Sequence, residues 1–515
     1  MSQAQAPPRL AVAGRLDRGA LGFGLLAFLL HAALAGRYDV FRDELYFIVC
    51  GRHPAFGYAD QPPIIPLLAA SLYGIGHNAW WLRLPNALAA GALVWLSARF
   101  ARLLGGGGAA AALAALSVAI APLLMGMGAV LNTTAFDPLA WTAIAYLLVR
   151  ASLSGRGRDL WLCGLIAGLD LEIKYALVIW AVGLTVGLVL TAERKLLARR
   201  DFWFGVGLAG LIAVPSGVWQ ALHHFPFLEL GAAAREKNAD VAPAAFLLNQ
   251  VLIMSPLLAP VWIAGLIGPF VAGALRPARF LAIGFVVYLG LVILTHGKDY
   301  YLGACYPALL AIGAVALVRV AEPAWARWAL AGGAALAVAF SAWLSPMILP
   351  VLPVPALRTF IAHSPVLLQP QEKGFKGTLL PQLFADQLGW RDFTAEVDAA
   401  WLRIPPAERA HTAIKVDNYG EAAALDVYGA RLGLPPALSG HNQYFLWGLR
   451  GQNPTNLLVV QNHVERLGPY CQKATRLATT TMPDAMASEN GKAIAYCQGL
   501  KVDLAAYWPQ LKDYS

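Results

Sequence analysis

Residues 41–66 read FRDELYFIVCGRHPAFGYADQPPIIP and follow the first apolar stretch of the chain. This segment carries an acidic pair, Asp43 and Glu44, and a third acid, Asp60, which stands directly before Gln61 and two prolines. A polar loop between membrane spans should lie at the water interface, where carboxylates beside lipid are costly unless they serve a function. The segment therefore favours chemistry on a lipid-linked substrate.

The composition is that of a polytopic membrane protein. The chain has 515 residues, of which 58% are hydrophobic and 13% are charged, and its mean hydropathy is +0.56. Soluble domains average about 25% charged residues. The net charge of +9 does not indicate nucleic-acid binding, because the Arg and Lys residues cluster between apolar stretches, as charges that flank membrane spans do.

Apolar stretches of spanning length predict about eleven transmembrane helices, at roughly 20 residues per span. The first is expected to be a retained helix rather than a cleaved signal peptide, because it is long enough to span and many further spans follow. The fifth and sixth could form one bent helix or a hairpin. The stretches lie near residues 20–36, 82–98, 107–129, 135–150, 160–173, 176–192, 203–221, 245–272, 280–295, 301–319 and 328–349.

The basic residues predict the orientation of these spans. Threading the helices alternately places five basic clusters on one side, together with Arg9, Arg15 and Arg18, and this side is expected to be cytoplasmic. The 37–81 loop and everything after residue 350 then lie outside, with a cytoplasmic N-terminus and a periplasmic C-terminal domain, as in a multi-pass protein of a bacterial inner membrane. The clusters are Arg99 with Arg102; Arg150, Arg156 and Arg158; Arg194, Lys195, Arg199 and Arg200; Arg276 with Arg279; and Arg319 with Arg327.

The chain is expected to divide into a membrane domain, residues 1–352, and a C-terminal α/β domain, residues 353–515. Strands are predicted at 412–416 and 457–460, with a helix at 421–428 between them. Cys471 and Cys497 both fall in this second domain. An oxidising compartment favours a disulfide between them over two free thiols.

Three acids are candidate catalytic residues: Asp43, Glu44 and Asp137. One carboxylate of the first pair could deprotonate an acceptor hydroxyl while the other holds a hydrogen-bond network. The alternative is that the pair only stabilises the N-terminus of an interfacial helix. Asp137 precedes Pro138 at an expected helix start, so an N-capping role is a second reading that is compatible with function.

Several further residues are candidates for binding substrate. Asp60 and Gln61 precede two prolines that would fix a turn and start a helix, and the alternative is a capping Asp alone. Lys174 lies among apolar residues and could hold a phosphate as a point charge, or belong to a self-neutralising cluster. Arg235, in the 222–244 loop, is a weaker cationic candidate.

The turn around residues 296–301 is the last candidate. His296 and Lys298 could bind a phosphate, and Tyr300 and Tyr301 could line a lipid or sugar site. The alternative is an aromatic belt with a snorkelling Lys. No P-loop, no GxGxxG, no zinc-ligand spacing and no GxSxG is found, so no cofactor is expected, and a divalent metal is possible but not indicated.

These motifs resemble a known group of enzymes. The segments 42–46 (RDELY) and 57–63 (GYADQPP) look like the first-loop signature of bacterial polytopic glycosyltransferases of the GT-C superfamily. That group is related to the dolichyl-phosphate-mannose protein mannosyltransferases and to the lipid A aminoarabinose transferase. Supporting matches lie at 132–137, 298–307, 381–390 and 418–422.

The resemblance implies a polyprenyl-phosphate sugar donor, no nucleotide sugar, and Asp43 as the catalytic carboxylate. Asp60 and Asp137 would match the secondary acids of the family. Related enzymes carry a His or Lys that contacts phosphate where this chain has Gln61. The resemblance therefore leaves Lys298, Lys174 or Arg235 to hold the phosphate.

The resulting hypothesis is a membrane glycosyltransferase that moves a sugar from a polyprenyl phosphate to a hydroxyl of lipid A, another glycan lipid or a protein. The rival is a transporter or flippase for a lipid-linked glycan. Transporters typically show repeated halves and broken helices at the midplane. No repeat is found here, and the acids lie in expected outer loops.

Overall fold

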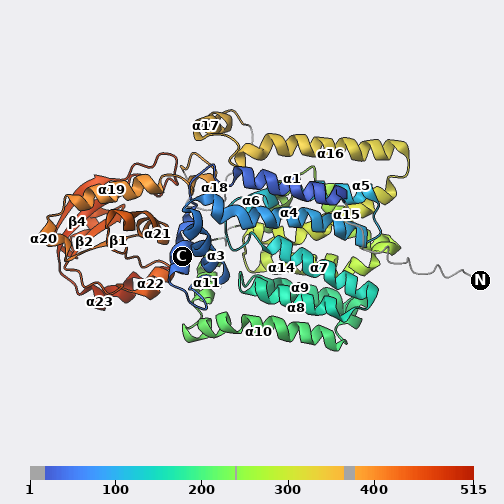
Figure 1. Cartoon of the computed structure of the whole chain (residues 1–515), viewed down its shortest axis with the longest axis horizontal. Coiled ribbons are helices and arrows are strands. Elements are labelled where there is room, and N and C mark those ends of the chain that lie inside the picture. Colours follow the sequence, from blue (N-terminus) through green and yellow to red (C-terminus); the bar gives the residue numbers. More distant parts are fainter. Residues whose placement is uncertain (1–17, 238–240, 365–376, 515) are drawn as a thin grey trace, which may run out of the picture.

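The structure is a computed structural model, and it describes residues 18–237, 241–364 and 377–514. Arg9 and Arg15, which were expected on the cytoplasmic side, lie outside these residues. Figure 1 shows long helices running along the long axis of the molecule, with a small sheet beyond one end and the shorter helices α3, α11 and α18 between the two parts.

The helical part includes both long apolar helices and the short helices of the first loop. Its helices are α1 (Arg18–Leu34), α2 (Arg42–Arg52), α3 (Ile64–Gly76), α4 (Ala79–Leu103), α5 (Gly108–Ile120), α6 (Pro122–Met127), α7 (Asp137–Ser154), α8 (Gly157–Leu171), α9 (Leu177–Val189), α10 (Arg200–Leu222), α11 (Pro226–Lys237), α12 (Pro243–Ile253), α13 (Ala259–Val271), α14 (Arg279–Leu294), α15 (Tyr306–Val320), α16 (Ala324–Leu344) and α17 (Val354–Ala362).

Each of the eleven expected stretches contains one or two of these helices, but fewer segments are long enough to count as spans by themselves. Among the described residues, four segments combine the length and the apolar composition that a crossing needs. They are Arg200–Leu222, Gly273–Leu294, Asp299–Val320 and Ala324–Met347. The number of transmembrane helices therefore stays a prediction.

Several boundaries differ from the expectation. Residues 160–192 form two separate helices, α8 and α9, and not one long bent helix. The expected continuous stretches 107–129 and 245–272 are each broken in two. The first break falls at Pro122, which has no N–H to continue the preceding helix, and the second falls at Ser255, whose φ of 78° is left-handed.

Small residues let the apolar helices approach closely. A Cβ atom added to Gly24 of α1 would lie 2.7 Å from the Gly91 carbonyl oxygen of α4, and a Cβ on Gly91 would lie 2.7 Å from the Gly24 oxygen. Close backbone contact of this kind is typical of helix packing in membranes. It joins α1 closely to α4 in the helical bundle.

The first loop is itself mostly helical. The expected external loop 37–81 contains α2 and α3, and α3 begins at Ile64, directly after the two prolines that were predicted to start a helix. The buried side chains of α2 belong to the same core as those of the C-terminal helix that contains residues 422–427. This shared core holds the acid pair of α2 against the C-terminal part of the chain.

The C-terminal part contains a four-stranded sheet in the order β1-β2-β4-β3. β1 and β2 pair in parallel, with Thr412 opposite Asn456, and the remaining pairs are antiparallel. The predicted strands and the helix between them are confirmed. The elements are β1 (Thr412–Val416), β2 (Asn456–Gln461), β3 (Cys471–Thr479), β4 (Ala493–Leu500), α18 (Gln382–Ala385), α19 (Trp390–Leu402), α20 (Pro406–Arg409), α21 (Tyr419–Tyr428), α22 (Gln443–Trp447) and α23 (Leu504–Tyr507).

Alternating residues of the strands build two separate cores. Ile414 and Leu458 point to the face that packs with α19, α21 and α2, whereas Ala413 and Leu457 belong to the core of the opposite face. This alternation is the period of a strand. The first core joins the sheet to the helical part and fixes α21 beside the first loop.

Candidate active site

A cavity of about 630 Å³ lies where the two parts of the chain meet. Its polar wall combines residues of the first loop with residues of three later turns of the helical part, and Gln382 and Tyr419 contribute from the C-terminal part. Much of the remaining lining is apolar. Seven residues predicted from the sequence line this one cavity: Asp43, Asp60, Gln61, Lys174, Lys298, Tyr300 and Tyr301.

Asp43 stands in the first turn of α2 and reaches the cavity. Its Oδ1 accepts a hydrogen bond of 2.7 Å from the hydroxyl of Tyr419, and Arg42 Nε lies 3.7 Å from the same oxygen. The side chain is 32% exposed, so it remains open to a ligand. A carboxylate in this setting can accept a proton from a bound hydroxyl.

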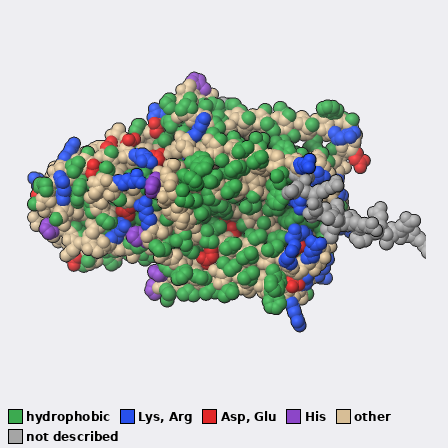
Figure 2. Space-filling model, viewed as in Figure 1, with side chains coloured by type: hydrophobic (Ala, Val, Ile, Leu, Met, Phe, Trp, Pro, Cys, Tyr) green, Lys and Arg blue, Asp and Glu red, His purple; other side chains and the backbone are tan. Residues whose placement is uncertain are grey.

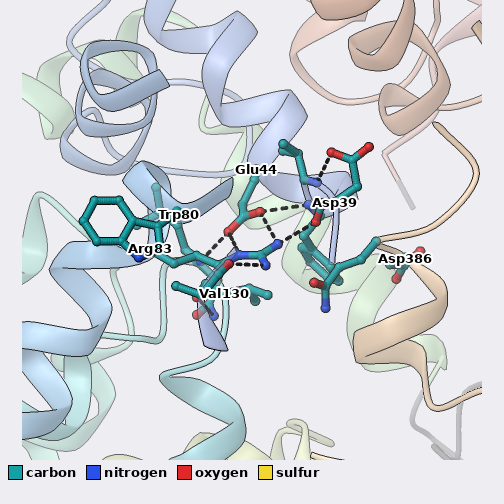
Figure 3. A network of polar contacts seen from close by, with 12 residues as sticks. Asp39, Glu44, Trp80, Arg83, Val130 and Asp386 are labelled. Carbon is teal, nitrogen blue, oxygen red and sulfur yellow. Dashed lines mark hydrogen bonds and ion pairs between the residues drawn. The ribbon is translucent and has the colours of Figure 1, made fainter. Parts of the chain in front are cut away.

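Glu44 differs from its neighbour, because it is completely buried in a network of polar contacts (Figure 3). Its two carboxylate oxygens accept hydrogen bonds from Arg83 at 2.8 and 2.9 Å and from the backbone N–H groups of Phe41 and Leu131, both at 2.8 Å. Glu44 does not line the cavity. The geometry thus favours the reading in which Glu44 holds a hydrogen-bond network, and not the reading in which it touches substrate.

The same network continues from Arg83 to the start of the first loop. Arg83 also donates to the carbonyl oxygens of Ala35 at 2.9 Å and Asp39 at 2.8 Å (Figure 3). These bonds tie α4 to the segment that leads into α2. They fix the beginning of α2 and so the position of Asp43.

Asp60 and Gln61 line the cavity together. Asp60 accepts hydrogen bonds from the Tyr46 hydroxyl at 2.8 Å and from Asn442 Nδ2 at 3.3 Å. Burial raises the pKa of Asp60 to about 6, against the opposing effect of the Tyr46 hydrogen bond. Gln61 is 2% exposed, and its Nε2 makes no hydrogen bond of good geometry within the described chain, which leaves a donor at the cavity wall.

Lys174 follows the end of α8 and pairs with Asp137 at the start of α7. Its Nζ lies 3.8 Å from Asp137 Oδ2, 4.9 Å from the centre of the Tyr301 ring and 5.9 Å from that of Tyr300. Asp137 is buried and lies behind Lys174, outside the cavity lining. Asp137 therefore acts on the cavity through Lys174, and its position outside the lining does not support direct contact with a ligand.

Lys298 approaches the cavity from the turn after α14. Its Nζ lies 5.8 Å from the centre of the Tyr300 ring, and the Tyr300 and Tyr301 rings meet edge to face at 5.1 Å. Both lysines thus lie within 6 Å of the centre of the Tyr300 ring, and Lys174 also lies near Tyr301. They supply positive charge on the side of the cavity formed by the helical part.

Two predicted binding residues lie elsewhere. His296 has an exposed side chain at a φ of 50°, and Arg235 has an exposed side chain on α11. Neither lines the cavity. Among the residues that the structure describes, no group of three or more His, Cys, Asp or Glu side chains could hold a metal ion.

Tyr419 and Thr134 also line the cavity, although neither was predicted from the sequence as a site residue. Tyr419 belongs to the polar segment 417–421 that follows β1, and its position directly after a strand was the available signal.

In the same part of the chain, the structure joins Cys471 of β3 and Cys497 of β4 in a disulfide, with their Cα atoms 5.4 Å apart.

Comparison with known proteins agrees with the motifs of the first loop. The family model described as dolichyl-phosphate-mannose-protein mannosyltransferase matches residues 60–219. The resemblance to this family is thus confirmed over these residues. No curated protein matches the chain by sequence.

Two solved structures share the fold over almost the whole chain. The crystal structure of ArnT from Cupriavidus metallidurans bound to undecaprenyl phosphate has a TM-score of 0.59 at 15% identity, and covers 93% of this chain and 98% of its own. The apo crystal structure of the same protein has a TM-score of 0.56 at 16% identity, with coverages of 93% and 97%. At these identities the likeness establishes a common fold.

Proposed function

We propose that this chain is a membrane glycosyltransferase that moves a sugar from a polyprenyl-phosphate donor to an acceptor hydroxyl. The observation that carries the proposal is the single cavity that contains a carboxylate, Asp43, and two lysines, Lys174 and Lys298, within a largely apolar lining. A lipid-linked sugar phosphate needs these features together: an apolar wall for the lipid, positive charge for the phosphate, and a base for the acceptor. The undecaprenyl phosphate bound to ArnT supports a donor of this class.

The proposed reaction is one displacement at the anomeric carbon. Asp43 takes the proton of the acceptor hydroxyl as that oxygen forms a bond to the anomeric carbon, and the bond from this carbon to the phosphate oxygen breaks. The products are the glycosylated acceptor and a polyprenyl phosphate, with inversion at the anomeric carbon. The leaving phosphate carries charge, so cationic stabilisation helps more than general-acid catalysis.

Both lysines line the cavity and can share this electrostatic work. We assign the contact with the donor phosphate to Lys298, because Gln61 brings no charge to the site and Lys298 stands in a short turn at the cavity wall. Lys174, which lies 3.8 Å from Asp137, takes a supporting role. Gln61 Nε2 adds a neutral donor where related enzymes are expected to carry a charge.

We place the reaction on the outer face of the bacterial inner membrane. Lys and Arg side chains gather at the end of the helical part that is remote from the sheet (Figure 2), and this asymmetry supports a cytoplasmic assignment for that end. The cavity and the sheet then lie on the opposite side. A reporter fused after Leu196 and one fused after Tyr514 should report opposite sides of the membrane, and the same side for both would contradict the orientation.

The direct test is transfer by the purified protein in liposomes. A series of donors carries different sugars on the same polyprenyl phosphate, and an envelope lipid fraction serves as the acceptor. The glycosylated product and the free polyprenyl phosphate are both measured. We expect equal amounts of the two products from at least one donor. Transbilayer movement of intact donor without sugar release would favour the flippase alternative.

A further inference from the structure

The C-terminal part of the chain contacts the proposed base through the side chain of Tyr419. The hydroxyl of Tyr419, in the first turn of α21, donates to Asp43 Oδ1 at 2.7 Å across 376 residues of sequence. Tyr419 also lines the cavity, so this contact lies at its wall and not behind it. A hydrogen bond to a carboxylate oxygen is stronger than one between neutral groups and fixes the plane of the carboxylate.

The Tyr419 ring is held from three sides. Its centre lies 4.7 Å from that of Tyr46 and 4.9 Å from that of His441, and the Arg42 guanidinium carbon lies 5.2 Å from it. The ring therefore has little freedom to turn its hydroxyl away from Asp43.

The backbone beside Tyr419 is fitted closely to α2. A Cβ added to Gly420 would lie 2.3 Å from Arg42 Cγ, so this approach of α21 to α2 requires glycine. Asn418 caps α21 by accepting from the amides of Gly420 at 2.9 Å and Glu421 at 3.0 Å. The first turn of α21 is thus fixed at both its cap and its contact with the first loop.

A buried ion pair connects this turn to the sheet. Glu421 Oε1 lies 2.5 Å from Lys492 Nζ, next to the start of β4, and Glu489 Oε2 lies 3.2 Å from the same nitrogen. All three side chains are at most 5% exposed. The sheet therefore sets the position of α21, and α21 sets the position of the Tyr419 hydroxyl.

We infer that Tyr419 is a positioning residue for the transfer reaction: it binds one oxygen of Asp43 and leaves the carboxylate aimed into the cavity. The inference rests on the proposed function, in which Asp43 is the base. It assigns the C-terminal part of the chain a direct role in turnover, because the site is incomplete without a hydroxyl from α21.

Tyr428 provides a matched control. It lies at the other end of α21, and its hydroxyl donates to Asp39 Oδ1 of the first loop at 3.3 Å. It does not line the cavity. Tyr428→Phe therefore removes a hydrogen bond between the same two parts of the chain without changing the surroundings of Asp43.

The experiment compares full-length parent, Tyr419→Phe and Tyr428→Phe proteins in the transfer assay. We expect kcat to fall about 10- to 100-fold in Tyr419→Phe, with the KM for the donor unchanged within about twofold, as when a reacting group loses its orientation. Tyr428→Phe should keep kcat within about twofold. The melting temperatures of the two variants should be similar, which separates positioning from the stability of the fold.

A double variant tests whether Tyr419 acts through Asp43. Asp43→Asn with Tyr419→Phe should be no slower than Asp43→Asn alone, because residues that act as a unit are not additive. If the parent is active and kcat is equal in Tyr419→Phe and Tyr428→Phe, the role of Tyr419 is overturned and the proposed function is not. Additive losses in the double variant would have the same meaning. A parent that transfers no sugar from any donor would overturn both.

Discussion

Glu44 and Arg83 form an ion pair with two hydrogen bonds, from Arg83 Nε to Oε1 at 2.9 Å and from Nη2 to Oε2 at 2.8 Å, and both side chains are at most 1% exposed. The pair joins the first turn of α2 to α4. Asp43, the next residue back along the chain, points instead to the cavity. Two adjacent acids therefore have different roles: one holds the helix, and the other is available for chemistry.

Glu44→Gln is expected to destabilise the protein, because it leaves the buried Arg83 charge without its partner. Breaking a buried ion pair costs roughly 3–5 kcal/mol. Thermal unfolding in detergent should show a clear fall in melting temperature. Adding Arg83→Met to Glu44→Gln should recover part of the loss, and a Glu44→Gln protein as stable as the parent would contradict the structural role.

Lys298→Ala is expected to raise the KM for the donor, because Lys298 stands at the cavity wall and we assign it the phosphate. Lys298→Arg should keep part of the function. Lys195→Ala is the matched control, since this lysine is exposed in the loop between α9 and α10 and does not line the cavity. Steady-state kinetics with varied donor provide the measurement, and an unchanged KM in Lys298→Ala would transfer the assignment to Lys174.

The stability of the folded protein is expected to depend on pH through Asp60. Burial raises its pKa from 3.8 to about 6, so the folded state holds this proton more tightly than the unfolded state does. The stability that this group contributes is full below pH 3.8 and is lost as pH rises through about 6. Asp60→Asn removes this loss.

The measurement is the melting temperature of parent and Asp60→Asn at pH 4.5 and pH 7.5. The melting temperature of Asp60→Asn minus that of the parent should be larger at pH 7.5 than at pH 4.5. The comparison between pH values cancels any fixed effect of the new amide on the hydrogen bonds of Tyr46 and Asn442. An identical difference at both pH values would show that Asp60 does not titrate as its burial predicts.

The disulfide between Cys471 and Cys497 is expected to stabilise the sheet. The two residues are 26 positions apart, and a loop of this size corresponds to roughly 3 kcal/mol in the chain-entropy model. Replacing both by Ser should lower the melting temperature of the C-terminal part, and reduction of the parent should have a similar effect. Mass spectrometry of unreduced protein should find the linked peptides, whereas two freely alkylated thiols would contradict the pairing.

The sequence predicted local features of the fold well. The strand at 412–416 and the helix after the prolines at residues 62 and 63 were predicted correctly, because strand-forming and turn residues act locally. The breaks at Pro122 and Ser255 were missed, because apolar composition continues across both. Composition measures affinity for lipid, not the continuity of backbone hydrogen bonds.

The candidate site was predictable in its residue types but not in its assembly. Polar residues in an apolar chain singled out Asp43 and Lys298, which line one cavity. His296 has the same local context as Lys298 and yet points away, since its side-chain direction depends on a left-handed backbone turn. The role of Tyr419 depends on how α21 docks against α2, and no local pattern contains that information.

Asp43 is the proposed base of the sugar transfer, and Asp43→Asn removes its basicity. The amide keeps the size of the side chain and can still accept from Tyr419, but it cannot take the proton of the acceptor. Donor binding and melting temperature should stay close to those of the parent, because the surrounding contacts remain.

The deciding measurement is kcat of Asp43→Asn for transfer from a purified polyprenyl-phosphate sugar in liposomes, with donor binding measured on the same preparation. We expect a fall of about 10²- to 10⁴-fold, the usual contribution of a positioned base, with donor affinity retained. Near-normal turnover by a folded, donor-binding Asp43→Asn protein would contradict the role of Asp43 as the base and leave Asp60 as the remaining carboxylate of the sequence-predicted set at the cavity wall.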